Sequence, residues 1–155
     1  MASIHSITYQ PVKRQEEYIE DQFLRIPIEE AQLIENFGME GDAKAGHNLN
    51  RQLNLVSQDW VQSLSDQGFK TAPGQFGEQM SVSGIELTDL PEGTLLQLGS
   101  QAVIELTKNR TGCVRLETVQ GKTLQEINGP IGVLAKVVTG GMIQVGDDVK
   151  VLEAA

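Results

Sequence analysis

The chain has 155 residues, 39% of them hydrophobic and 16 of them glycine, a length that suits one domain with its own apolar core. Twelve cations against twenty-one acids give a net charge of −9, so no sequence-wide field attracts nucleic acid or an anionic membrane. There is no apolar run of the roughly 18 residues that cross a bilayer, and no signal-peptide pattern at the N-terminus. One cysteine cannot form an intramolecular disulfide, so we expect a cytoplasmic protein.

Short strands separated by turns are the main local pattern. The strands expected in chain order cover residues 3–9, 22–28, 53–56, 80–82, 94–98, 102–107, 133–138 and 148–152. The acid-rich stretch 13–21 is expected to be a solvated loop, and 29–37 stays open between a short helix and a strand. Ser57 is placed to cap a helix over about 58–66, and a second short helix is expected over 114–120.

This spacing of strands predicts the fold class. Many short strands between glycine-bearing turns, with one or two helical insertions, are typical of a β-barrel or a β-sandwich. The sequence contains no internal repeat, low-complexity segment or linker. We therefore expect a mainly β protein with residues 1–155 in a single domain.

Two segments, 41–51 and 107–116, carry charge opposite in sign to that of the whole chain. Together they hold 21 residues, with five of the twelve cations and only one of the twenty-one acids. Arginine forks and loop amides are the usual means of holding phosphate or other oxyanions, so these segments predict a site for a small anionic ligand. The alternative is that the cations pair with surface carboxylates elsewhere in the protein.

The only cysteine, Cys113, lies in the second of these segments among three cations, Lys108, Arg110 and Arg115. Nearby cations lower a cysteine pKa from its free value of roughly 8.5, and the thiolate is the form that attacks, carries sulfur or binds metal. The alternative is that the lone cysteine is a small buried hydrophobic residue. Phosphate-loop, dinucleotide-binding, paired-cysteine zinc and serine hydrolase motifs are all missing from the sequence.

An ordered set of short motifs carries a family resemblance. The motifs are Gly41–His47, Arg51–Leu55, Phe76–Glu78, Gly84–Leu87, Leu90–Thr94, Leu98–Gly99, Thr107–Cys113 and Gly132–Asp147. Each motif alone is weak, but the set in this order strongly resembles the MOSC domain, named for the C-terminal domain of molybdenum cofactor sulfurases. The resemblance runs from about residue 37 to residue 152.

The resemblance implies a MOSC-type β-barrel that binds the molybdenum cofactor (molybdopterin) or carries sulfur. It makes Cys113 the catalytic residue, either a sulfur acceptor or a thiolate ligand of molybdenum. Loops 41–51, 74–78 and 108–113 share a high glycine content, and two of them carry clustered cations, so we expect them to converge on one face of the barrel. The residues expected to bind the cofactor are Lys44, His47, Arg51, Glu78, Asn109 and Arg110, with Glu78 orienting one of the others.

The sequence also departs from the family pattern. Gly112 stands where many relatives have proline, and Lys44 where many have an aromatic residue, histidine or arginine. Pyridoxal phosphate is not expected in this chain, so a sulfur-carrying role needs a cysteine desulfurase or a molybdoenzyme as partner. Two alternatives stay open. One is a cofactor-binding chaperone without catalysis, and the other is the terminal component of a reductase of N-hydroxylated compounds with a separate electron donor.

Overall fold

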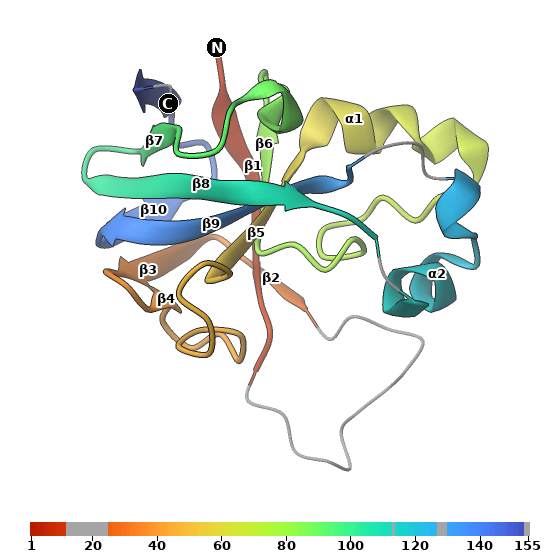
Figure 1. Ribbon diagram of the computed structural model, residues 1–155, viewed down its shortest axis with the longest axis horizontal. Helices are drawn as coiled ribbons and strands as arrows, with labels where there is room; N and C mark the ends of the chain where they lie inside the picture. The colour runs from red at the N-terminus through yellow and green to blue at the C-terminus, as the bar shows by residue number, and fades with distance from the viewer. Residues whose placement is uncertain (12–24, 113, 127–129, 154–155) are drawn as a thin grey trace.

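The computed structural model describes residues 1–11, 25–112, 114–126 and 130–153, and the protein is mainly β (Figure 1). Its strands are β1 (Ser3–Tyr9), β2 (Ile26–Ile28), β3 (Glu30–Ile34), β4 (Gly38–Met39), β5 (Leu53–Ser57), β6 (Met80–Ser83), β7 (Leu95–Leu98), β8 (Ala102–Arg110), β9 (Gly132–Thr139), β10 (Gly141–Gln144) and β11 (Val149–Glu153). The helices are α1 (Gln58–Ser63) and α2 (Val114–Gln120), with 3-10 turns at Ser65–Gln67, Leu87–Asp89 and Leu124–Glu126. Among the described residues, no helix is long and apolar enough to span a membrane.

The strands form two sheets. Eight strands lie in the order β11-β7-β8-β9-β5-β6-β1-β2, and all neighbours are antiparallel except β5 and β6. The second sheet has the order β10-β3-β4. Both sheets enclose one apolar cluster, to which β1, β3, β5, β6, β7, β8, β9 and β10 each contribute buried side chains. In Figure 1, β8 crosses the front of the molecule, and both helices lie at the same side, beyond the end of β5.

The mainly β prediction is confirmed, although the strand ladders of the described residues do not close into a full barrel. The hydrogen-bonded ladders leave β2 and β11 as the two edges of the large sheet. An isolated bridge between Ser3 and Asp148 brings the start of β1 to the chain just before β11. Closure stops there because β2 already pairs with β1 from Ile7 to Tyr9. Only the first residues of β1 remain for contact with the other end of the sheet.

Local predictions from the sequence differ in how well they match. β1 and α2 begin and end where they were expected, and the ambiguous stretch 29–37 contains strand β3. Strand β10 begins at Gly141, two residues after the end of β9, and was not expected from the sequence. Residues 22–24 and the whole of the expected loop 13–21 lie outside the described residues.

The helix expected after Ser57 is shorter than predicted. It ends at Ser63, a 3-10 turn follows, and Gly68 stops that turn with a φ of 85°. Ser57 occupies the N-cap position without a side-chain capping bond. Its hydroxyl instead accepts a hydrogen bond from the Leu87 amide at 2.9 Å. The Ser57 side chain is thus directed to the Leu87 segment and not to the first turn of its own helix.

A second apolar cluster lies beside the helices and fixes the turn over residues 74–78. It joins buried residues of α1 and α2 with Phe69, Phe76 and Ile131. The rings of Trp60 and Phe76 lie 5.6 Å apart at a tilt of 59°. Because Phe76 is almost fully buried, packing holds this turn against the body of the protein.

Candidate functional site

The last five residues of β8 extend beyond its pairing with β7. β7 pairs with β8 only as far as Glu105, whereas β9 pairs with it to Arg110. A loop was expected from residue 108, but strand β8 continues to Arg110. Lys108 and Arg110 share one face because side chains alternate along a strand, and Asn109 lies on the other face.

Arg110 is buried and contacts the turn over residues 74–78. Its Nη1 donates a hydrogen bond of 2.6 Å to the carbonyl of Phe76. Opposite Arg110 in the ladder is Gly132, and a Cβ at that glycine would lie 2.2 Å from the Leu55 carbonyl oxygen. The sheet is therefore unusually tight beside Arg110, and only glycine fits at position 132.

Glu78 holds the turn over residues 74–78 from inside. Its two carboxylate oxygens accept hydrogen bonds from the amides of Gly74 at 2.6 Å and Phe76 at 3.0 Å. Burial raises the pKa of Glu78 above its ordinary value of 4.5, and the two amides and the charge of Arg25 act in the opposite direction. Glu78 thus binds the turn over residues 74–78 directly. It also holds the Phe76 peptide, whose carbonyl accepts the hydrogen bond from Arg110.

Loop 41–51 is anchored by Asp42, whose carboxylate is fully buried. Its Oδ1 accepts hydrogen bonds of 2.7 Å from the Gln10 amide and from Nη2 of Arg25. Its Oδ2 accepts from the Lys44 amide and from Nε2 of Gln79, both at 3.2 Å. All the lone-pair positions of the carboxylate are therefore used in holding the start of the loop.

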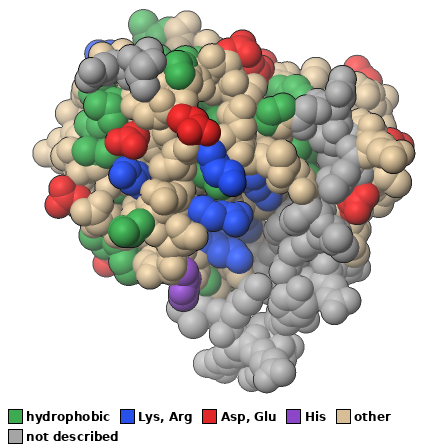
Figure 2. Space-filling view, in the orientation of Figure 1, with side chains coloured by type: hydrophobic (Ala, Val, Ile, Leu, Met, Phe, Trp, Pro, Cys, Tyr) green, Lys and Arg blue, Asp and Glu red, His purple; other side chains and the backbone are tan. Residues whose placement is uncertain are grey.

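The far end of this loop is attached to β8. The Thr107 hydroxyl donates a hydrogen bond of 2.6 Å to the Asn50 carbonyl, which places Arg51 next to the strand that carries Lys108. Arg51 and Lys108 are exposed, and their side chains make no hydrogen bond or ion pair with the described residues. In Figure 2, lysine and arginine side chains gather near the centre of this face.

Asn54 adds a buried acceptor to the same face. It opposes Leu134 of β9, and Leu134 opposes Lys108 of β8, so the three side chains share one face of the sheet. Its Nδ2 lies 3.5 Å from the Gly77 carbonyl, but its Oδ1 is buried and has no hydrogen-bond partner among the described residues. A buried acceptor without a donor is costly, and a bound ligand or a water would satisfy it.

The predicted site residues are thus only partly brought together. Arg51, Arg110 and Glu78 lie around the junction of loop 41–51, turn 74–78 and the end of β8. His47 is exposed, and its Nε2 makes a 3.0 Å hydrogen bond with the Ala43 carbonyl of its own loop. Lys44 is exposed on the same loop, while Asn109 points to the opposite face of β8 from Arg110.

Cys113 lies outside the described residues, so its predicted nearness to Arg51 and His47 stays a prediction. In the chain it follows Gly112, directly after β8 and before α2. Among the described residues, no group of three or more His, Cys, Asp or Glu side chains could hold a metal ion.

Sequence reasoning missed Arg25, Thr8 and Asn54. Arg25 lies next to an acid-rich stretch, and nothing in its spacing pairs it with Asp42. Thr8 is one of several β-branched residues in β1, and the signal for its role appears only when β1 pairs with β6. The alternation of polar Asn54 between Leu53 and Leu55 could have placed it on the outer face of a strand.

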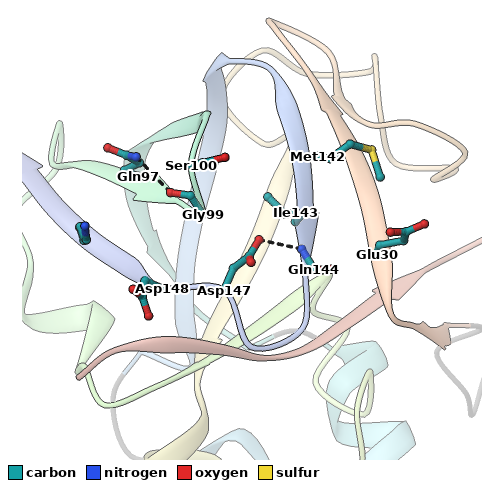
Figure 3. Close-up of a pocket in the computed structure, with 10 residues that line it drawn as sticks. Glu30, Gln97, Gly99, Ser100, Met142, Ile143, Gln144, Asp147 and Asp148 are labelled. Carbon is teal, nitrogen blue, oxygen red and sulfur yellow. Dashed lines mark hydrogen bonds between the residues drawn. The ribbon is translucent and has the colours of Figure 1, made fainter.

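A hollow of about 680 Å³ lies elsewhere, between the small sheet and the β7–β11 edge (Figure 3). Its lining includes three carboxylates, Glu30, Asp147 and Asp148, against one cation, Lys150. The Asp147 carboxylate accepts a hydrogen bond of 2.9 Å from the Gln144 amide, so it serves the β10–β11 turn. An excess of negative charge disfavours an anionic ligand here, and this hollow is not the predicted site.

The chain is similar to known proteins in sequence pattern and in fold. The family model of the MOSC domain matches residues 42–150. No curated protein sequence matches the chain. The crystal structure of the YuaD protein from Bacillus subtilis superposes with a TM-score of 0.76 at 18% identity, covering 96% of this chain and 94% of that one.

Two further crystal structures share the fold. YiiM from Geobacillus stearothermophilus has a TM-score of 0.74 at 19% identity, covering 99% of this chain and 76% of its own. YiiM from Escherichia coli has a TM-score of 0.69 at 20% identity, covering 99% of this chain and 71% of its own. At these identities the structural matches establish the fold.

Proposed function

Because the chain belongs to the MOSC domain family, which is associated with molybdenum cofactor binding, we propose that it binds this anionic pterin cofactor at the end of β8. The observation that carries the proposal is the face shared by Lys108 and Asn54, to which Thr107 attaches the loop that bears Arg51. It combines exposed cations with a buried acceptor in an otherwise acidic protein.

The residues present fit such a ligand. Its phosphate and oxo groups need a guanidinium fork and an ammonium, which Arg51 and Lys108 supply. The pterin ring carries N–H donors, and Oδ1 of Asn54 is a buried acceptor without a donor among the described residues. Arg110 and Glu78 contribute indirectly, since they hold the turn over residues 74–78 in place.

Cys113 is the reactive group in this proposal. Lys108 and Arg110 precede it in the chain and stabilise a thiolate over the thiol, whose proton passes to solvent. When bound, the cofactor supplies a molybdenum centre for which a soft thiolate is a suitable ligand. In a sulfur-carrying role, the thiolate attacks the outer sulfur of a donor persulfide, a new S–S bond forms, and the donor's thiolate leaves.

Binding measurements on two variants test the proposal. Arg51→Ala and Lys108→Ala should each weaken cofactor binding by roughly tenfold to a hundredfold, since hydrogen bonds to charged groups contribute about 1.5–3 kcal/mol. Isothermal calorimetry with pterin cofactor from a cofactor-producing host gives the Kd. Thermal melts should hardly change, because exposed ion pairs contribute only about 0–1 kcal/mol.

Lys150→Ala is the matched control, because it removes a cation from the acidic hollow and should leave binding unchanged. Arg51→Lys should restore affinity only in part, since it keeps the charge and loses the planar fork. Cys113→Ser separates the roles of the cysteine. It abolishes sulfur transfer in a carrier and leaves much of the affinity in a chaperone. Unchanged binding in both cation variants would overturn the proposal.

A further inference from the structure

Arg25, at the start of β2, makes the only ion pair among the described residues in which both side chains are buried. Its side chain is 2% exposed, that of Asp42 is 0% exposed, and Nη2 lies 2.7 Å from Asp42 Oδ1. Asp42 in turn begins the loop that ends at Arg51. The guanidinium therefore acts directly on the loop that carries one of the proposed ligand-binding cations.

The other side of the same guanidinium contacts β1. Nε donates a hydrogen bond of 2.9 Å to the Thr8 hydroxyl, and Nη2 donates to the Thr8 carbonyl at 3.3 Å. The Thr8 hydroxyl itself donates a hydrogen bond of 2.6 Å to the Glu78 carbonyl. Because the Thr8 hydroxyl is donor and acceptor at once, it joins Arg25 to the end of the turn over residues 74–78.

The path continues to Arg110 through that turn. The Glu78 carboxylate binds the Gly74 and Phe76 amides, and the Phe76 carbonyl accepts from Arg110. An unbroken series of buried groups thus runs from Asp42 through Arg25 and Thr8 to Arg110. It joins two elements of the proposed binding face that are otherwise far apart in the chain.

We propose that Arg25 is a positioning residue for the anion site and sets loop 41–51 against the turn over residues 74–78. This inference rests on the proposed function, since it assigns the purpose of the geometry to ligand binding. A buried ion pair is weak evidence for stability, because apolar residues of similar volume often stabilise as well or better. A planar fork contacting two segments does fix their relative position.

Hydrogen exchange tests the coupling without any ligand. In Arg25→Lys the charge beside Asp42 is kept, but one ammonium cannot reproduce the fork to both Asp42 and Thr8. Amides in peptides covering residues 41–52 and 72–79 should exchange on the order of tenfold faster in this variant. Thr8→Val, which removes only the hydroxyl, should speed amide exchange in the same two peptides. It replaces Arg25→Lys in the test if that variant does not fold.

Ser6→Ala is the matched control on the same strand. It removes another buried hydroxyl, which makes a 2.6 Å hydrogen bond with Ser81 of β6 and takes no part in the path. It should lower the melting temperature by an amount similar to Thr8→Val and leave exchange in both peptides unchanged. Faster exchange in only one of the two peptides, or equal loosening in Ser6→Ala, would overturn the coupling.

Cofactor binding then tests the positioning role. Arg25→Lys and Thr8→Val should raise the calorimetric Kd on the order of tenfold, the loss of about one good hydrogen bond, while Ser6→Ala should not. Thr8→Ser should restore the wild-type Kd because it keeps the hydroxyl. An unchanged Kd at a lowered melting temperature would make Arg25 purely structural. If the wild-type protein does not bind the cofactor, the proposed function fails and hydrogen exchange alone decides the coupling.

Discussion

The basic face at the end of β8 and the acidic hollow beside β10 use charged residues in opposite ways. At the basic face the acids Asp42 and Glu78 are buried, and backbone amides and side chains use up their oxygens. In the hollow Glu30 and Asp148 are exposed, and of the carboxylates there only Asp147 accepts a hydrogen bond among the described residues.

This difference shows why the acidic hollow is the weaker candidate. A site needs its ligand-facing groups held in fixed positions by the groups behind them. Arg51 and Lys108 have such support from Thr107, Asp42 and the β8–β9 ladder, whereas Lys150 lies on an exposed edge strand. Three stability predictions, given in order of decreasing effect, test this difference between the two regions.

The largest effect is expected from removing one buried charge of the basic face. Asp42→Asn should lower the free energy of unfolding by about 3–5 kcal/mol, because it leaves Arg25 buried without its counter-charge and places an amide NH2 donor against groups that are themselves donors. Urea unfolding followed by circular dichroism measures it. Asp148→Asn, an exposed acid of the hollow, should change stability by about 0.5 kcal/mol or less. Equal losses in the two variants would erase the distinction between the regions.

A smaller effect is expected from a single methyl group. Gly132→Ala places a Cβ 2.2 Å from the Leu55 carbonyl, so β5 and β9 must separate, at about 1–3 kcal/mol. Gly146→Ala, in the turn beside the hollow, meets no atom within 4 Å and should cost only about 1 kcal/mol for its φ of 95°. The denaturation midpoints of the two variants, each compared with that of the wild type, check this difference in stability. A mild Gly132→Ala would mean that the sheet beside Arg110 can relax.

Much of the strand pattern could be predicted from sequence because it is local. β1 is rich in β-branched residues, and α2 begins two residues after Gly112, so short-range chemistry determines both. β10 was missed because Gly141, which looks like part of a turn, is its first residue. The open edges of the large sheet could not be foreseen either, since they depend on which strand pairs with the free edge of β1.

The candidate site was predictable only where charge stood out against the composition. The cations of segments 41–51 and 107–116 are visible in the sequence, and Arg51 and Lys108 do lie on neighbouring elements. The buried support is not visible. Arg25 meets Asp42, and Thr8 meets Glu78, through pairings between segments distant in the chain. Such pairings become evident only once the sheet has brought β1, β2 and β6 together.

The smallest expected effect concerns Glu78 and depends on pH. Burial raises the pKa of Glu78 in the folded protein above the ordinary value of 4.5 that it has when unfolded. Between these two values the folded state binds more protons than the unfolded state, so stability falls as pH rises. Below pH 4.5 the carboxyl is protonated in both states and contributes no slope. Above the folded pKa the loss is complete and the curve is flat again.

Glu78→Gln removes this titration while keeping the size of the side chain and one acceptor for the turn amides. The free energy of unfolding from urea titrations between pH 4 and pH 8 should therefore be compared as a difference, wild type minus variant. That difference should decrease from about pH 4.5 upward and then level off, because only the wild type has to bury the charge. A difference that increases with pH would mean that the Gly74 and Phe76 amides and Arg25 outweigh burial. Glu78 would then be a stable buried anion, and removing Arg25 would cost correspondingly more.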